Sequence, residues 1–295
     1  MIDKKELLKW CRVKSADLIN HPERRVPLRI VRDSAEMGRL MARELADEII
    51  KANAEKRQCV AVIPCGPRCW YKPFTDLVNA ENVSMKNFVG LHMDECLNWE
   101  GKLLKEKDPN NFRAYMEIHF YGNVHKELQA PAAQRYYPTP ANLEAMHELA
   151  MSLPIDITLG GWGQDGHLAF NQARREPYSP ITLDELRSST IRIQNNNWDT
   201  VLALAQRGFG GGYQFVAPMS ITYGLKECMR AKKVRVYSDT GAWKQTALRV
   251  ALFSKPDVEY PFTLLQEHPD AVLTATEETT HHPVSENPDW EFDGM

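Results

Sequence analysis

The sequence predicts an α/β fold with a mostly parallel sheet. Short apolar runs rich in β-branched residues alternate along the chain with longer segments of helical periodicity. Several of these runs also end in polar or glycine-containing turns. This alternation is typical of βαβ units, whose strands are parallel. The expected strands cover residues 28–31, 59–63, 88–91, 155–159, 234–237 and 271–275.

Two segments of helical periodicity follow strands directly. After the first strand, Asp33 or Ser34 is expected to cap an amphipathic helix. A second helix is expected over 242–253, after the fifth strand and its turn. The apolar side chains of the first helix recur at helical spacing, at positions 37, 40, 41, 45, 49 and 50.

The chain is expected to form one domain with two appendages. Residues 1–27 are predicted to be an N-terminal helical appendage, 28–276 the domain itself, and 277–295 an irregular tail with little to bury. Within the domain, the polar segment 97–113 is predicted to be a lid over a nearby site. The glycine-rich segment 208–212 is expected to be a flexible connection.

The composition indicates a globular protein without an extended nucleic-acid-binding surface. A chain of 295 residues can bury a full core, and a net charge of −3 argues against a basic surface spread over it. No segment approaches 18 uninterrupted apolar residues, and the first residues lack the apolar stretch of a signal peptide. We therefore expect a cytoplasmic protein that does not span a membrane.

The cysteines and histidines do not predict a metal site. The six cysteines show no spacing typical of a disulfide framework, as expected for reduced thiols. Cys65 and Cys69 are separated by three residues only, which is a poor zinc signature. His281 and His282 are more typical of a solvated tail than of a metal centre.

Residues 160–171 are the most informative stretch and read Gly-Gly-Trp-Gly-Gln-Asp-Gly-His-Leu-Ala-Phe-Asn. Glycines at the carboxyl end of a strand let backbone N–H groups approach a ligand, and ligands of open α/β sheets bind at that edge. Asp165 and His167 are carried to the same place. Histidine transfers protons at neutral pH, and a nearby carboxylate can fix its tautomer. The stretch therefore predicts a catalytic or sugar-phosphate site.

Other candidate groups also follow predicted strands. Asp94 and Glu95 follow one strand, Cys65 to Arg68 follow another, and Lys244 opens the helix after a third. Taken alone, Asp94 could be a helix cap, and the two basic residues could be solvated surface charges. A cation near a helix N-terminus is disfavoured by the helix dipole, but a bound phosphate would reverse that penalty. The position of Lys244 therefore favours an anion site.

Five stretches carry a shared pattern, namely residues 92–95, 108–116, 160–171, 231–234 and 244–248. Together they resemble glucosamine-6-phosphate deaminases, also called isomerases, over about residues 28–276. This resemblance implies a three-layer, Rossmann-like α/β domain without a nucleotide cofactor. It also implies a small-molecule sugar-phosphate substrate and reversible conversion of an amino-sugar phosphate to a ketose phosphate, with loss of ammonia.

The resemblance also implies roles for individual residues. Asp94 matches the base that moves a proton between C2 and C1, and Asp165 and His167 match the groups that promote ring opening. Lys244 matches a phosphate-binding lysine. An aldose–ketose interconversion needs such a carboxylate base and an acid at the ring oxygen. Further candidates for contact with the substrate or its phosphate are Cys65, Gly66, Arg68, Glu95, Gly161, Gly163 and Arg207.

Three departures from the family pattern bear on the reaction. Gln172 stands where the family has a glutamate that pairs with the histidine, and an amide cannot exchange protons. The family's Thr-Gly-Gly-Thr-like phosphate loop is replaced by Cys65 to Arg68, so we expect Arg68 to compensate and to flank one anion site with Lys244. Arg207 lies one residue out of register with a second basic ligand. From these departures we expect weak activity on glucosamine 6-phosphate and a gain from Gln172→Glu.

Two alternative functions remain open from the sequence. Phosphosugar lactonases of the same superfamily share a glycine-rich Asp-Gly-His turn, in which the histidine would activate water against an ester carbonyl. A catalytically weak sugar-phosphate sensor would keep the binding residues, with Gln172 marking lost chemistry. No DNA-binding helix pair is evident, so a sensor would need a partner. A homo-oligomer is compatible with the sequence.

Overall fold

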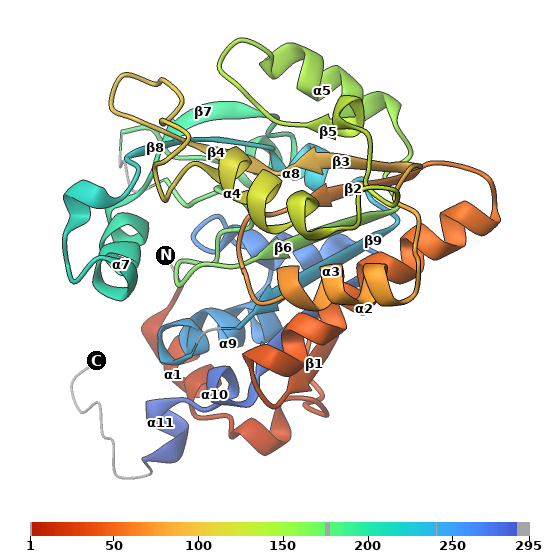
Figure 1. Cartoon of the computed structure of the whole chain (residues 1–295). Helices are drawn as coiled ribbons and strands as arrows, with labels where there is room; N and C mark the ends of the chain where they lie inside the picture. Colours follow the sequence, from red (N-terminus) through yellow and green to blue (C-terminus); the bar gives the residue numbers. More distant parts are fainter. Residues whose placement is uncertain (1, 175–177, 240, 288–295) are drawn as a thin grey trace.

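The structure is a computed structural model that describes residues 2–174, 178–239 and 241–287. A sheet of seven strands, all paired in parallel, crosses the molecule in the order β1-β10-β9-β6-β2-β3-β5 (Figure 1). This arrangement confirms the predicted mostly parallel α/β fold. The strands are β1 (Leu28–Val31), β2 (Cys59–Ile63), β3 (Phe88–His92), β5 (Arg135–Tyr136), β6 (Ile157–Gly161), β9 (Lys233–Ser238) and β10 (Ala271–Thr276).

Helices cover both faces of this sheet, giving three layers. One face packs against α2, α3 and α4, and the other against α5, α8 and α9. The helices are α1 (Lys4–Cys11), α2 (Ser34–Ala54), α3 (Tyr71–Ala80), α4 (Phe112–His119), α5 (Leu143–Ser152), α6 (Leu183–Arg187), α7 (Trp198–Gly208), α8 (Leu225–Cys228), α9 (Gln245–Phe253), α10 (Glu277–Thr280) and α11 (Pro283–Glu286).

The central strand β2 shows why these residues form a buried sheet. Successive side chains of a strand point to opposite faces. Val60 and Val62 accordingly join the core on the α5 side, whereas Cys59, Ala61 and Ile63 join the core on the α2 side. Because both faces are covered, the strand is apolar throughout.

Helix α2 begins where its sequence predicts. The Asp33 side chain accepts a hydrogen bond of 2.7 Å from the backbone N–H of Glu36, so Asp33 is the N-cap. The helix then buries its apolar stripe, which includes Met37, Met41 and Leu45, against the sheet. The strand predicted at 155–159 lies two residues further along the chain in the structure. There β6 covers Ile157–Gly161 and so includes the first glycines of the turn.

A second sheet of three antiparallel strands was not predicted. It has the order β4-β8-β7 and consists of β4 (Asp94–Leu97), β7 (Arg192–Asn195) and β8 (Met219–Thr222). Asp94 is the first residue of β4 and pairs with Thr222. The sheet therefore begins two residues after β3 ends and holds Asp94 at the edge where the parallel strands end.

The expectation of an irregular tail from residue 277 was wrong for 277–287, where the chain forms α10 and α11. These helices bury polar groups against α9. The Arg249 guanidinium donates to the carbonyl oxygens of Thr280 (2.8 Å) and Val13 (2.9 Å), and His282 pairs with Thr246 at 3.0 Å. His282 is buried rather than solvated. Residues 288–295 lie outside the described part of the chain.

Among the described residues, no helix is long and apolar enough to cross a membrane.

Candidate functional site

A cavity of about 340 Å³ lies at the edge where β2, β3, β6 and β9 end, and it has the size of a small-ligand site. Helix α7, from an insertion between β7 and β8, supplies one wall. The lining residues are Pro64, Gly66, Pro67, Met93, Asp94, Phe112, Gly161, Trp162, Gly163, Gln164, Asp165, His167, Ala169, Phe170, Thr200, Ala203, Leu204, Arg207, Asp239 and Lys244.

The glycine turn after β6 carries Asp165 and His167 into this cavity. The Asp165 Oδ1 atom lies 2.6 Å from His167 Nδ1. Asp165 is buried, so this contact fixes Nδ1 as the protonated nitrogen and leaves Nε2 to face the cavity. A Cβ atom at Gly163 would collide with the His167 ring and with the Asp165 carboxylate. The glycine therefore makes room for the Asp–His pair.

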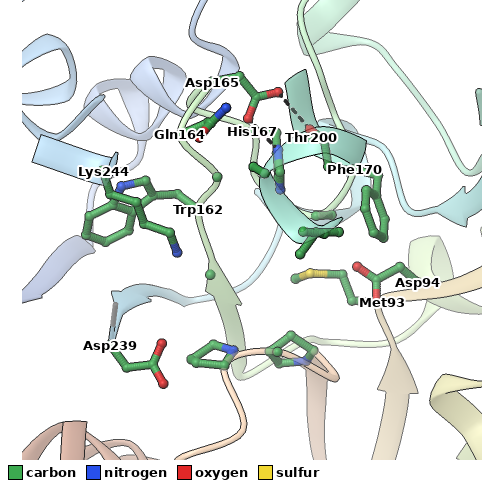
Figure 2. A pocket seen from close by; sticks show the side chains of 18 of the residues that line it. Met93, Asp94, Trp162, Gln164, Asp165, His167, Phe170, Thr200, Asp239 and Lys244 are labelled. Carbon is green, nitrogen blue, oxygen red and sulfur yellow. Dashed lines mark hydrogen bonds and ion pairs between the residues drawn. The ribbon is translucent and has the colours of Figure 1, made fainter. Parts of the chain in front are cut away.

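Asp94 reaches the same cavity from the start of β4 (Figure 2). Its side chain is buried, and the residue is 8% exposed. Burial, with a smaller contribution from the charge of Glu95, raises the pKa of Asp94 to about 8. A carboxylate with such a pKa is a far stronger base than an exposed aspartate and can exchange protons near neutral pH.

Two cations line the cavity wall nearest α9. Lys244 comes just before this helix, and Arg207 comes from the last turn of α7. Burial lowers the pKa of Lys244 to about 8 and that of Arg207 to about 10, because neither charge is fully hydrated. The Arg207 guanidinium lies 3.6 Å from the Trp243 ring centroid and donates to Gln164 Oε1 at 3.3 Å. Together the two cations form a site suited to an anion.

Asp239 lies on the same wall as Lys244 (Figure 2). Its charge raises the pKa of Lys244 and so opposes part of the burial effect. Sequence reasoning did not single out this carboxylate, because it stands in the turn after β9 like many helix caps. It reduces the net positive charge that an anion meets there.

Arg68 does not join this anion site, and its predicted pairing with Lys244 was wrong. Its guanidinium carbon lies 3.7 Å from the Tyr115 ring centroid, and it donates to the Pro109 carbonyl at 3.4 Å. The side chain thus turns toward α4 and is not among the lining residues. Gly66 does line the cavity. Cys65 does not: it is buried behind the turn, where its carbonyl accepts from the Tyr71 hydroxyl.

Glu95 also differs from its expected role as a substrate ligand. Its carboxylate accepts hydrogen bonds from the backbone N–H groups of Cys96 (2.9 Å), Phe112 (2.8 Å) and Arg113 (2.8 Å). It therefore caps the N-terminus of α4 and fixes the C-terminal end of segment 97–113. Of this predicted lid, only Phe112 is among the residues that line the cavity.

Gln172 is buried, but it does not pair with His167 as the family glutamate was expected to do. Its Nε2 atom donates to Thr200 Oγ1, and its Oε1 atom accepts from the backbone N–H of Asn197 at 3.0 Å. Thr200 lines the cavity and hydrogen-bonds to Asp165 Oδ2 at 3.4 Å. Sequence reasoning missed Thr200, because a threonine in the first turn of a helix carries no functional signal of its own.

Comparisons with known proteins give matches over most of the chain. The glucosamine-6-phosphate deaminase of Aeromonas hydrophila subsp. hydrophila is 28% identical over an alignment of 276 positions; the alignment covers 87% of this chain and 91% of that protein. A structure of a monomeric glucosamine-6-phosphate deaminase, described as belonging to the NagB superfamily, matches with a TM-score of 0.72. The match covers 85% of this chain and 98% of that one at 22% identity. The chain is a divergent relative of the glucosamine-6-phosphate deaminases.

Other comparisons place this relationship in a wider fold group. The glucosamine-6-phosphate deaminase of Yersinia pseudotuberculosis is likewise 28% identical, over 266 residues, with 87% of this chain and 91% of that protein covered. The 6-phosphogluconolactonase of Shewanella baltica OS155 shares the fold with a TM-score of 0.59 at 14% identity, covering 84% of this chain and 97% of that one. No protein-family model matches the chain.

Proposed function

We propose that this chain converts an amino-sugar phosphate and water into a ketose phosphate and ammonia. The observation that carries the proposal is the buried carboxyl group of Asp94, which lines one cavity with His167 and with Lys244 (Figure 2). A base, a proton-transferring imidazole and an anion-binding cation are the three groups that such an aldose–ketose conversion requires.

Each group has a defined task in the proposed reaction. Lys244 and Arg207 hold the phosphate and so fix the sugar in the cavity. His167, held by Asp165, accepts the proton of the C1 hydroxyl on Nε2 and passes it to the ring oxygen as the bond between C1 and that oxygen breaks, so the ring opens to the aldehyde. Asp94 then takes the proton from C2 and returns it to C1, while a proton passes from the amino nitrogen to the C1 oxygen, which gives a ketimine at C2 and a hydroxyl at C1. Water adds to the C2 carbon of this imine, and ammonia leaves.

The buried Asp94 also separates this proposal from the lactonase alternative. A lactonase needs a base that activates water against an ester carbonyl, and His167 with Asp165 could supply it. That reaction gives no task to a second, desolvated carboxyl group across the cavity. Burying such a group costs stability, so its presence favours a reaction that moves protons on carbon. Because the chain shares its fold with a 6-phosphogluconolactonase, the lactonase reaction is tested beside the proposed one.

Turnover of a substrate panel tests the proposal. The purified chain is incubated with amino-sugar 6-phosphates, and ammonia and ketose phosphate are measured together; we expect the two in equal amounts. Asp94→Asn is expected to lower this turnover by about 10²- to 10⁴-fold. Hydrolysis of a phosphosugar lactone without ammonia release would establish the lactonase instead. Binding of the sugar phosphates without any turnover would indicate a sensor.

A further inference from the structure

Four side chains form a continuous hydrogen-bonded series at the wall of the cavity. Gln172 contacts Thr200, Thr200 contacts Asp165 at 3.4 Å, and Asp165 contacts His167 at 2.6 Å. Figure 2 shows the last three members, with Thr200 reaching Asp165 from α7. Gln172, Thr200 and Asp165 are all buried. Solvent therefore does not compete for these hydrogen bonds.

The direction of every hydrogen bond in this series can be assigned. The backbone N–H of Asn197 can only donate, so the Gln172 atom that it contacts at 3.0 Å must be the amide oxygen. The Gln172 nitrogen consequently faces Thr200 and donates to its hydroxyl oxygen. The single hydroxyl hydrogen of Thr200 remains available, and Asp165 Oδ2 accepts it.

We propose that Gln172 and Thr200 are positioning residues that act through Asp165 to hold His167 in its Nδ1–H tautomer. This inference rests on the proposed function, because it assigns the groups that orient the ring-opening histidine. One Asp165 oxygen binds the imidazole and the other binds the Thr200 hydroxyl, so the carboxylate cannot rotate away from the ring. The amide at 172 is therefore a matched partner of Thr200 and not a remnant of a lost carboxylate.

A glutamate at position 172 would change which groups donate and which accept along the series. Its carboxylate can only accept, so it would take the Thr200 hydrogen away from Asp165 and would also face the Asn197 N–H. It would add a negative charge to a buried neighbourhood that already holds Asp165. The other charged side chains lining this cavity are those of Asp94, Asp239, Lys244 and Arg207. Gln172→Glu is thus expected to disturb the site, the opposite of what the sequence resemblance suggested.

The first test compares Thr200→Val, which removes the hydroxyl at equal volume, with Thr200→Ser, which keeps it. We expect kcat to fall about 10- to 100-fold in Thr200→Val with KM within about threefold, and Thr200→Ser to restore kcat to within about threefold. Thr274→Val is the matched control, because its buried hydroxyl on β10 has no described hydrogen-bond partner. Equal kcat in all three variants would overturn the proposal.

The second test does not depend on turnover. Nitrogen chemical shifts of His167 in the ligand-free protein report which ring nitrogen carries the proton. We expect the Nδ1–H tautomer in the parent and in Thr200→Ser, and a mixture of tautomers in Thr200→Val and in Gln172→Glu. If Thr200→Val does not fold, Gln172→Glu provides the comparison. An unchanged tautomer in these variants, or a gain in kcat in Gln172→Glu, would overturn the proposal. If these tests find the hydrogen-bonded series as proposed but the parent protein releases no ammonia, the proposed function is rejected and the role of the series is not.

Discussion

Asp94 and Lys244 line one cavity, and burial brings the pKa values of both groups to about 8 from opposite directions. The carboxyl group resists losing its proton, and the ammonium group gives its proton up early, because neither charge is well hydrated. The proposed reaction needs Asp94 ionised and Lys244 protonated. Only a limited range of pH satisfies both requirements.

The first prediction is a bell-shaped pH profile of kcat/KM with its maximum near pH 8. The rising limb reflects ionisation of Asp94, and the falling limb reflects deprotonation of Lys244. Lys244→Arg should remove the falling limb below about pH 9, because even the Arg207 guanidinium in this cavity has a pKa of about 10. Initial rates at low substrate concentration between pH 6 and 10 provide the measurement. A falling limb that survives in Lys244→Arg would assign it to another group.

The second prediction concerns the stability that Asp94 costs. Its pKa is about 8 in the folded state and near 3.8 when unfolded, so the folded state binds more protons between these values. Stability therefore falls as pH rises from about 4 to 8. Asp94→Asn removes this loss and should raise the free energy of unfolding by about 1 to 4 kcal/mol at pH 7. The gain should vanish near pH 3.5, where the carboxyl is protonated in both states; urea denaturation at the two pH values measures it. A gain of equal size at both would contradict the prediction.

The parallel sheet was predictable because its signal is local. In β2, Val60 and Val62 face one core and Ala61 and Ile63 the other, so the strand is apolar on both faces and stands out from its neighbours. The antiparallel strand that begins at Asp94 has no such signal. Its first residues are acidic, and its partner strand lies more than a hundred residues further along the chain.

The candidate site was predictable in its location but not in the direction of its side chains. The turn with Asp165 and His167 lies where the glycines indicated, and Lys244 and Arg207 also line the cavity. Arg68 was misjudged because the ring of Tyr115 attracts its guanidinium, a contact that sequence spacing does not reveal. The contact of Gln172 with Thr200 could not be predicted, because Thr200 comes from a separate insertion.

The third prediction separates the two basic residues that the sequence had paired. Lys244→Met should raise KM for a sugar phosphate by about 10- to 100-fold, since it removes a charge that lines the cavity. Arg68→Met is the matched control and should change KM by less than about threefold, because Arg68 packs on Tyr115 outside the lining. The inhibition constant of inorganic phosphate as a competitor should rise in each variant by about the same factor as KM. A comparable loss in both variants would return Arg68 to the anion site.

The fourth prediction concerns His282, which lies in the segment expected to be irregular. Its Nδ1 atom accepts from the Val284 N–H at 3.1 Å, and its Nε2 atom contacts the Thr246 hydroxyl at 3.0 Å. Burial, with a smaller contribution from the Arg249 charge, lowers the pKa of His282 to about 4. The ring is therefore neutral in the folded protein over most of the accessible pH range.

The unfolded chain binds a proton at His282 below about pH 6.5, whereas the folded chain does so only near pH 4. This group alone should therefore lower the free energy of unfolding by about 1 to 3 kcal/mol as pH falls from 7 to 4.5. His282→Asn keeps an oxygen that can accept from Val284 and should remove this contribution, so its urea midpoint should depend less on pH. His281→Asn is the control, because His281 is exposed and, among the described residues, forms an ion pair with Glu286 at 3.2 Å. If the urea midpoints of both variants depend on pH as the parent's does, His282 does not make this contribution to the pH dependence of stability.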